Sequence, residues 1–343
     1  MRQLTFLEPG RFEWHDVPVP TLRAATDAIV RPLTVARCDL DLYIALGVVR
    51  YRGPFAFGHE SVGEVVEAGD QVPFEPGDRV VVPFQLSCGR CPTCRRGLTS
   101  SCESFPFGAA YGLKPTSKTE FGGALSDRMY VPFADHMLLP LPAGVDPLVA
   151  ASASDNIADG WRAVGPHLQE RPGASVLVLG GLAQSVGIYA AGCAVALGAG
   201  KVLYLDDHPE RRQRAAQLGA TAEPLGLADG RTPDLQFDIV VESAGNADAL
   251  AFAIRSTAAN GMLTSNSIHL RETTPVPLTG AYYKGLTLNT SRVSSRAVLP
   301  HVLACLEAGA LHPERVTHRV VPFADAADAM TDPGPKVVFT QDG

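Results

Sequence analysis

Short apolar runs, each ended by glycine, proline or a charged residue, recur through the first 150 positions. The clearest are at 28–33, 61–67, 79–84 and 129–132. Runs of this length bounded by turn residues are typical of β-strands. The pattern predicts a β-rich domain here, built as a small barrel or an irregular sheet.

From residue 175 onward the pattern becomes an alternation of apolar strands and longer helical stretches. Buried strands that alternate with helices indicate a parallel, doubly wound sheet. The predicted strands are at 175–179, 201–205, 237–242 and 262–265, with helices up to 197, at 210–220 and at 247–258. After residue 284 the pattern is mixed again, with one helix at 298–308 and a last strand at 336–340.

Composition narrows the class of protein. With 29 Lys and Arg against 36 Asp and Glu, the formal charge is −7. A mildly acidic chain without a basic block is a poor candidate for binding nucleic acid or an anionic membrane surface. The first ten residues lack the apolar core of a secretory signal, and no run reaches the roughly 18 apolar residues of a membrane span.

Seven cysteines are present, and four of them lie within fifteen positions. An odd, clustered set does not suit a disulfide framework, so we expect metal-binding thiols in a reducing compartment, the cytoplasm. The cluster has the spacing C-x2-C-x2-C-x7-C, at Cys88, Cys91, Cys94 and Cys102. Four thiolates close a tetrahedral structural zinc site and leave no position for substrate. A rubredoxin-like iron site would use the same ligands.

A second, open metal site is suggested by Cys38 and His59, which lie apart from the cluster. A catalytic zinc has three protein ligands and one open position. It also needs a carboxylate that orients the histidine, and Asp41 is a candidate for that role.

The ordered motifs resemble one family. They are Cys38-x-x-Asp41, Gly58-His59-Glu60-x-x-Gly63, Gly77-Asp78-Arg79-Val80 and the four-cysteine segment. In this order they resemble the zinc-dependent medium-chain alcohol dehydrogenases over nearly the whole chain. The resemblance implies a GroES-like catalytic domain, residues 1–150 and 285–343, around an inserted Rossmann domain, residues 151–284. It also implies dimers or tetramers formed through the cofactor domains.

The resemblance further implies the third ligand of the catalytic zinc. In the family it is Cys, Asp or Glu at the entry to the cofactor domain, and Asp155 falls at that position. A helix N-cap is the alternative role for Asp155, and Ser154 and Asp159 are rival caps or ligands. Glu60 is expected beside the zinc, where it helps exchange water or alcohol. Phe84 falls where the family has an aromatic of the substrate pocket, with plain core packing as the alternative.

One departure concerns the proton relay. The family usually has Ser or Thr two residues after the first cysteine ligand and often a histidine three residues later. This chain has Leu40 and Tyr43 there. Leucine cannot carry a proton. Either a zinc-bound water, Tyr43 or Asp159 carries the proton, or the substrate lies differently in the site.

The first predicted strand of the parallel sheet runs into a glycine-rich turn, at which the backbone can approach a pyrophosphate. The turn is two residues longer than G-x-G-x-x-G, and Gly187 takes the role of the last glycine. An acid after the second strand, Asp206, is expected on the ribose of NAD. Arg211, near the ribose by resemblance, and Arg212 leave NADP open. The expected cofactor contacts are Gly180, Gly181, Gln184, Ser185, Val186, Gly187, Asp206, Arg211, Ser243, Ala244, Gly245, Asn266, Ser267, Ile268 and Arg292.

Together these features imply an oxidoreductase with two zinc ions per chain and NAD. Zinc would polarise the oxygen of a primary alcohol, secondary alcohol or polyol while hydride passes between its carbon and the nicotinamide. Two alternatives remain: a reductase of the same fold with changed chemistry, and a non-catalytic zinc-binding protein.

Overall fold

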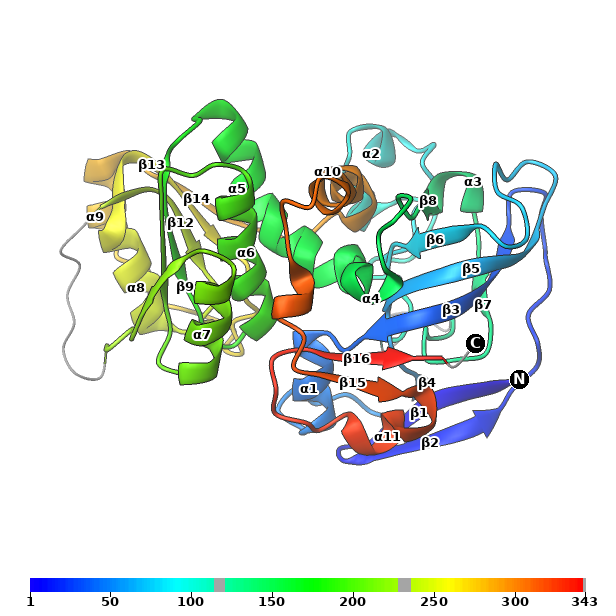
Figure 1. The fold of residues 1–343 in the computed structure, drawn as a ribbon. Coiled ribbons are helices and arrows are strands. Elements are labelled where there is room, and N and C mark those ends of the chain that lie inside the picture. The colour runs from blue at the N-terminus through cyan, green and yellow to red at the C-terminus, as the bar shows by residue number, and fades with distance from the viewer. Residues whose placement is uncertain (114–120, 228–235, 342–343) are drawn as a thin grey trace. The chain divides into compact units, whose positions relative to one another are not determined.

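In the computed structural model, residues 1–113, 121–227 and 236–341 are described. The chain forms two compact units (Figure 1). The first comprises Met1–Ala158, Val293–Glu307 and Thr317–Gly343, and the second comprises Asp159–Arg292 and Ala308–Val316.

The first unit contains the predicted β-rich domain. Its larger sheet has the strand order β15-β16-β3-β5-β6-β8, with β7 also paired to β3, and its smaller sheet has the order β2-β1-β4. The strands are β1 (Arg2–Glu8), β2 (Arg11–Asp16), β3 (Ala28–Ala36), β4 (Phe55–Ala56), β5 (Glu60–Ala68), β6 (Arg79–Val82), β7 (Met129–Val131), β8 (Leu139–Pro140), β15 (Arg319–Pro322) and β16 (Val337–Thr340).

Short helices connect these strands. They are α1 (Asp39–Ala45), α2 (Pro92–Arg95), α3 (Ala134–Met137), α4 (Pro147–Ala150), α10 (Ser295–Glu307) and α11 (Ala326–Ala329), with 3₁₀ turns η1 (Thr99–Ser101) and η4 (Phe323–Asp325) and a π-helical turn η2 (Ala153–Ile157). Two of the short elements position candidate ligands. Helix α1 begins directly after Cys38, and η2 contains Asp155.

The second unit is built on a six-stranded sheet with the order β11-β10-β9-β12-β13-β14, and every strand pair in it is parallel. Helices α8 and α9 lie on one face and α5 and α6 on the other (Figure 1). The predicted doubly wound parallel sheet is therefore confirmed. The strands are β9 (Ser175–Leu179), β10 (Lys201–Leu205), β11 (Thr221–Glu223), β12 (Phe237–Glu242), β13 (Thr257–Ser265) and β14 (Thr287–Thr290), and the helices are α5 (Ala158–Glu170), α6 (Gln184–Ala196), α7 (Pro209–Gln217), α8 (Ala247–Ser256), α9 (Leu278–Lys284) and the 3₁₀ turn η3 (Pro313–Arg315).

Two features were not expected from the pattern. The N-terminal residues form the hairpin β1–β2, which contributes Phe6 and Phe12 to a cluster of aromatic rings with Phe55 and Phe57. In addition, β14 continues the parallel sheet beyond residue 284, where the sequence places the return to the first domain. The four residues of β14 are exposed, so they lack the apolar run that marks a buried strand.

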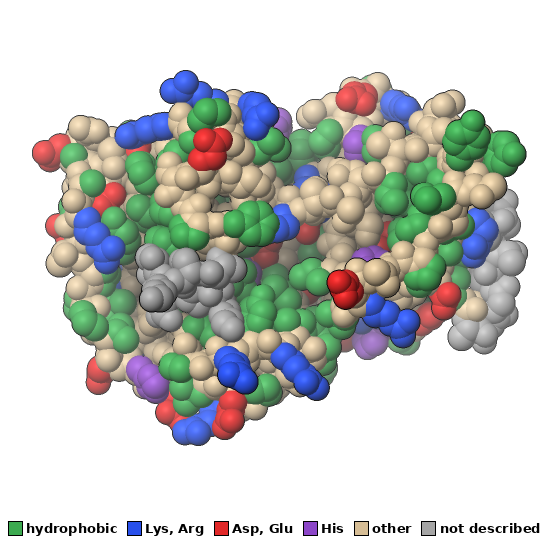
Figure 2. Space-filling view, turned by 180° about the vertical axis from the view of Figure 1, so that it is seen from behind, with side chains coloured by type: hydrophobic (Ala, Val, Ile, Leu, Met, Phe, Trp, Pro, Cys, Tyr) green, Lys and Arg blue, Asp and Glu red, His purple; other side chains and the backbone are tan. Residues whose placement is uncertain are grey.

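Among the described residues, no helix has the length and apolar character needed to cross a membrane. Positive and negative side chains are intermixed on the face shown in Figure 2.

Candidate metal and cofactor sites

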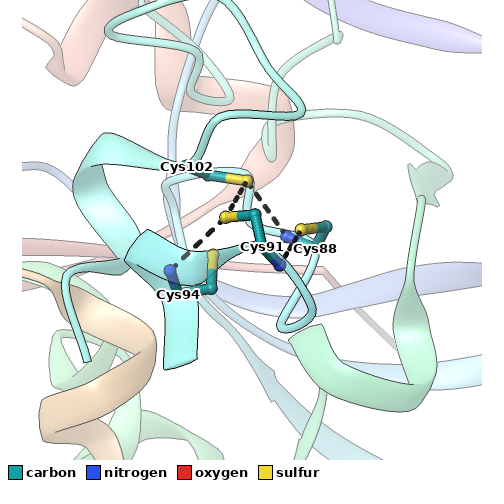
Figure 3. Close-up of side chains that lie close together, drawn as sticks. All are labelled: Cys88, Cys91, Cys94 and Cys102. Atoms are coloured by element: carbon teal, nitrogen blue, oxygen red, sulfur yellow. Dashed lines mark hydrogen bonds between the residues drawn. The ribbon is translucent and has the colours of Figure 1, made fainter. Parts of the chain in front are cut away.

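The four clustered cysteines converge in one short loop of the first unit (Figure 3). Their sulfurs all lie within 4.8 Å of one another. Cys91 caps the N-terminus of α2, Cys94 lies on that helix, and Cys102 ends η1. A tetrahedral zinc with Zn–S bonds of about 2.3 Å holds its sulfurs at comparable separations. The loop geometry therefore fits the predicted closed zinc site.

Backbone amides favour the thiolate forms of Cys88 and Cys91, whereas burial raises the pKa values of Cys94 and Cys102. The N–H groups of Arg90 and Cys91 donate to Cys88 Sγ at 3.4 Å, and Cys94 N–H donates to Cys91 Sγ at 3.4 Å. Burial raises the pKa of Cys88, but hydrogen bonds from Ser104 and these amides outweigh it and lower the pKa to about 6. A low-pKa thiol is a ready metal ligand.

A second cluster in the same unit joins Cys38, His59, Glu60 and Asp155. One ligand atom from each of these residues lies within 4.8 Å of the others, and all four residues are buried. Cys38 precedes α1, His59 directly precedes β5, Glu60 begins that strand, and Asp155 is on η2. Three separate elements thus bring sulfur, nitrogen and oxygen donors together, which is a donor set that suits zinc.

His59 lies between two carboxylates. Its Nε2 is 3.2 Å from Asp155 Oδ2, and its Nδ1 is 3.5 Å from Asp41 Oδ1. Asp41 also accepts a hydrogen bond from Cys38 N–H at 3.0 Å, so the start of α1 holds this carboxylate in place. Asp41 therefore has the position of a carboxylate that orients a metal-binding histidine.

Burial and close spacing shift the pKa values of the donors in this cluster. Burial raises the pKa of Cys38 well above its ordinary value, and Asp155 and Glu60 add to the shift. Burial also raises the pKa of Glu60 to about 8, although Lys336 opposes it. Burial alone would lower the pKa of His59, but Asp41 and Asp155 outweigh it and raise the pKa to about 9. A divalent cation would compensate these crowded anionic donors, so the residues fit the predicted zinc.

Sequence reasoning missed two residues that contact this cluster, Lys336 and Asn156. Lys336 is fully buried and pairs with Glu60 at 3.2 Å. Asn156 donates from Nδ2 to Cys38 Sγ at 3.2 Å. The position of Asn156 beside Asp155 was a usable signal. No feature of the sequence pointed to Lys336, because only the antiparallel pairing of β16 with β3 brings this residue close to Cys38.

The remaining predicted residues of this site have different surroundings. The Phe84 ring packs on His59 with centroids 5.3 Å apart, so it borders the predicted ligands. Tyr43 is half-buried on α1, and Leu40 packs against the core. Asp159 forms an ion pair with Arg162. The identity of the proton carrier stays a prediction.

In the second unit, the glycines of the β9–α6 turn are needed for close packing. A Cβ on Gly180 would lie 2.3 Å from Asp206 Oδ2, and one on Gly181 would lie 2.6 Å from Ala244 Cα. A Cβ on Gly187 would lie 3.2 Å from Ser243 Oγ. Gly187 therefore allows α6 to pack on the end of β12, as the last glycine of a dinucleotide motif does. Gln184, Ser185 and Val186 form the first turn of α6.

Asp206 follows β10, where a ribose-binding acid is expected, but other groups already surround it. Arg211 donates to both carboxylate oxygens at 2.7 and 2.8 Å. Tyr204 Oη–H and His208 N–H each donate at 2.8 Å. Arg212 donates to the Asp206 carbonyl at 2.7 Å rather than being only solvated.

The ends of β12 and β13 carry the predicted nicotinamide contacts. Ser243 Oγ–H donates to Asn266 Oδ1 at 2.7 Å. Asn266 Nδ2 and Ser267 Oγ are buried and have no hydrogen-bond partner among the described residues. Such orphaned polar atoms at the carboxyl ends of parallel strands fit a bound polar ligand. Gly245 follows β12, Ile268 follows β13, and both Ile268 and Arg292 are exposed.

A buried carboxylate supports these strand ends and was not anticipated from the sequence. Glu242 accepts from Gly245 N–H at 2.6 Å and from Ser265 Oγ–H at 2.6 Å, and it lies 3.2 Å from His269 Nε2. It thereby connects the loops that follow β12 and β13.

Comparisons with known proteins agree with this architecture. The family model "Alcohol dehydrogenase GroES-like domain" matches residues 24–143, and the model "Zinc-binding dehydrogenase" matches residues 185–308. An alcohol dehydrogenase from Thermus sp. ATN1 superposes with a TM-score of 0.90 and 32% identity, with 100% of both chains covered. The NADP-dependent isopropanol dehydrogenase of Thermoanaerobacter brockii is 30% identical over 292 residues, 81% of this chain and 79% of that protein.

The chain belongs to the zinc-dependent medium-chain alcohol dehydrogenase family. A Mycobacterium tuberculosis relative named "Probable zinc-binding alcohol dehydrogenase" is 29% identical over 95% of this chain and 84% of its own length. The predicted family and the α/β fold with GroES-like and Rossmann domains are confirmed. As a member of this alcohol dehydrogenase family, the chain is a zinc-dependent oxidoreductase, and the two alternatives from the sequence are not favoured.

Proposed function

We propose that this alcohol dehydrogenase transfers hydride between a primary alcohol, secondary alcohol or polyol and NAD, with one structural and one catalytic zinc per chain. The convergence of Cys38, His59, Glu60 and Asp155 within 4.8 Å carries the proposal. A cysteine, a histidine and an aspartate leave a fourth position open on zinc, whereas four cysteines do not. The two clusters therefore suit the two different tasks.

Each residue of the catalytic cluster has a proposed role. Cys38, His59 and Asp155 would hold the zinc, which supplies Lewis-acid polarisation of the substrate oxygen when bound. Asp41 orients the His59 ring through Nδ1. Glu60, held by Lys336, lies within reach of the ligand atoms. Phe84 covers the His59 ring and limits the access of water to it.

Proton transfer is assigned to Tyr43 or to a zinc-bound water. Leu40 offers no hydroxyl, and Asp159 is already paired with Arg162. Tyr43 is half-buried on α1, the helix that begins at the ligand Cys38, and its phenol can both accept and donate a proton.

NAD is proposed to bind the second unit through the glycine turn, Asp206 and the ends of β12 and β13. Asn266 Nδ2 and Ser267 Oγ are buried and lack a partner among the described residues, which supports binding of the nicotinamide group at the ends of β12 and β13. The proposed contacts are Gly180, Gly181, Gln184, Ser185, Val186, Gly187, Asp206, Arg211, Ser243, Ala244, Gly245, Asn266, Ser267, Ile268 and Arg292.

Cofactor choice is expected to depend on the Asp206–Arg211 pair. A carboxylate has about four acceptor positions, and Arg211, Tyr204 and His208 fill those of Asp206. Ribose hydroxyls must therefore replace part of the Arg211 interaction. Arg211→Ala is expected to raise the NAD-to-NADP ratio of kcat/KM about 10-fold, because it frees acceptors and removes a cation that attracts a 2′-phosphate.

The opposite variant supplies the control. Asp206→Ala is expected to lower the same ratio about 100-fold, since it removes the ribose acceptor and frees Arg211 for phosphate. Steady-state kinetics with both cofactors measures the two ratios. Equal ratios in the wild type and both variants would exclude this pair as the basis of cofactor choice.

A homodimer or homotetramer is proposed, with a subunit contact through the β14 edge of the second unit. In the described part of the sheet β14 pairs only with β13, and neighbouring α9 exposes Tyr282 and Tyr283 at 82% each. An unpaired strand edge beside exposed aromatic rings is a surface suited to a second copy. Light scattering is expected to give at least twice the chain mass of 36.3 kDa, whereas the mass of one chain would contradict the proposal.

The overall function is tested with purified, zinc-loaded protein and a panel of primary alcohols, secondary alcohols and polyols. The expected result is alcohol-dependent formation of reduced nicotinamide, which is lost on chelation and restored by zinc. Alcohol-dependent turnover that persists after complete removal of metal would refute the proposed role of the Cys38–His59–Asp155 site.

A further inference from the structure

The side chain of Asn156 contacts two of the three proposed zinc ligands. Asn156 follows Asp155 on η2 and is 2% exposed. Its Nδ2 lies 3.2 Å from Cys38 Sγ and 3.2 Å from Asp155 Oδ2. The N–H groups of one amide thus serve both a sulfur and a carboxylate ligand.

The opposite end of the amide is held by two donors. Asn156 Oδ1 accepts from Lys336 Nζ at 2.6 Å and from Asp39 N–H at 3.3 Å. Lys336 is itself buried and donates to the Arg37 carbonyl at 2.8 Å. An ammonium and a backbone N–H can only donate, so they determine which end of the amide is oxygen. The NH₂ group must therefore face the ligand atoms.

This arrangement connects a buried cation to the ligands through one polar group. Lys336 polarises the amide, and a polarised N–H is a stronger donor in a buried environment. A hydrogen bond to a thiolate stabilises its lone pairs and reduces the electron density that the sulfur donates to a metal. Groups that hydrogen-bond to ligands in this way orient the ligands and tune the metal.

We infer that Asn156 is a positioning residue of the proposed catalytic zinc site. It sets the donor strength of Cys38 and fixes the Cys38 and Asp155 ligands relative to each other. The inference rests on the proposed function, because it requires a metal held by Cys38, His59 and Asp155.

Cobalt(II) in place of zinc provides a direct readout of the Cys38–metal bond. The four-cysteine cluster would also bind cobalt, so the spectrum of cobalt-loaded Cys38→Ser, which lacks the Cys38 thiolate, is subtracted from each other spectrum. The difference spectrum isolates the thiolate-to-cobalt charge-transfer band of the Cys38 site.

The key variant is Asn156→Leu, which keeps a similar volume but has no N–H donor. Its charge-transfer band is expected at lower energy than in the wild type, because the thiolate loses a hydrogen bond. Because Asn156 no longer holds Cys38 and Asp155 together, metal affinity is expected to fall roughly 10- to 100-fold, with correspondingly faster transfer of the metal to a chelator. A loss of packing alone would not move the charge-transfer band in this direction.

The matched control is Ser154→Ala. Ser154 lies on the same turn and is fully buried, and its hydroxyl accepts from Ser61 N–H at 3.3 Å rather than bonding a ligand. Its band energy and chelation rate are expected to equal those of the wild type. If Asn156→Leu fails to fold, Asn156→Asp, which keeps the acceptor for Lys336 but has no N–H donor, is expected to show the same shift.

Two outcomes would overturn the inference in distinguishable ways. A normal wild-type difference spectrum that is unchanged in folded Asn156→Leu or Asn156→Asp refutes the role of Asn156 and leaves the proposed function intact. No difference between wild type and Cys38→Ser shows that no metal binds at Cys38, which refutes the proposed function together with the inference.

Discussion

Replacing Asp155 with alanine is expected to lower the zinc content from two ions per chain to one. Asp155 supplies the only carboxylate of the proposed ligand triad, and its Oδ2 lies 3.2 Å from His59 Nε2. Its loss leaves two protein ligands, too few for a stable catalytic zinc. Alcohol oxidation is expected to fall more than about 100-fold, beyond the effect of removing a residue that only supports a ligand. Elemental analysis and steady-state kinetics measure both results.

Two control variants sharpen this experiment. Asp155→Cys restores a ligand type that the family resemblance allows and is expected to retain the second zinc. Ser154→Ala removes the neighbouring rival ligand, whose hydroxyl accepts from Ser61 N–H, and is expected to retain two zincs and most activity. One zinc per chain in wild type and Asp155→Ala alike would mean that the catalytic mechanism must be withdrawn.

Replacing Cys102 with serine is expected to remove the structural zinc and destabilise the first unit. Cys102 Sγ accepts from Cys88 N–H at 3.3 Å and lies 4.0 Å from Cys91 Sγ. Without metal, the buried thiols lose the ion that organises their loop. Loss of a structural metal costs about 4 kcal/mol or more of the free energy of unfolding. For a unit of this size, that cost lowers Tm by roughly 10 °C.

Cys305→Ser is the matched control for this measurement. Cys305 is half-buried on α10, outside both clusters. Its replacement is expected to leave the zinc content unchanged and to shift Tm by no more than roughly 3 °C. Thermal unfolding followed by circular dichroism, together with zinc analysis, compares the two variants. Equal Tm values for Cys102→Ser and wild type would show that the four-cysteine loop does not depend on metal.

The elements with strong local patterns were predictable. Strands β9, β10 and β12 are mainly apolar segments bounded by turn residues, and they occur at the predicted positions. The hairpin β1–β2 was not predicted, because its stability depends on rings such as Phe55 and Phe57 that lie far along the chain. Strand β14 has no apolar pattern that would predict it, because it is exposed and is held by hydrogen-bonded pairing with β13 rather than by buried side chains.

The candidate site was predictable where spacing along the chain controls geometry. Cys88, Cys91, Cys94 and Cys102 lie on one loop, so their order and spacing alone predict convergence, and the structure brings them together. Cys38, His59 and Asp155 were brought together only through resemblance to a family, and the structure places them within one cluster. Their role as ligands stays a prediction that zinc analysis tests.

By itself, the sequence predicted the family and the α/β fold class, which the comparisons confirm, and it predicted two groups of metal ligands from local spacing and from ordered motifs. Only the tertiary structure decided what surrounds those residues. Asn156 contacts Cys38 across 118 positions, and Lys336 reaches the Arg37 carbonyl across 299. Arg211 occupies both oxygens of Asp206, which no spacing rule indicates. These contacts depend on strand register and side-chain conformation, which are set by packing of the whole unit rather than by neighbouring residues.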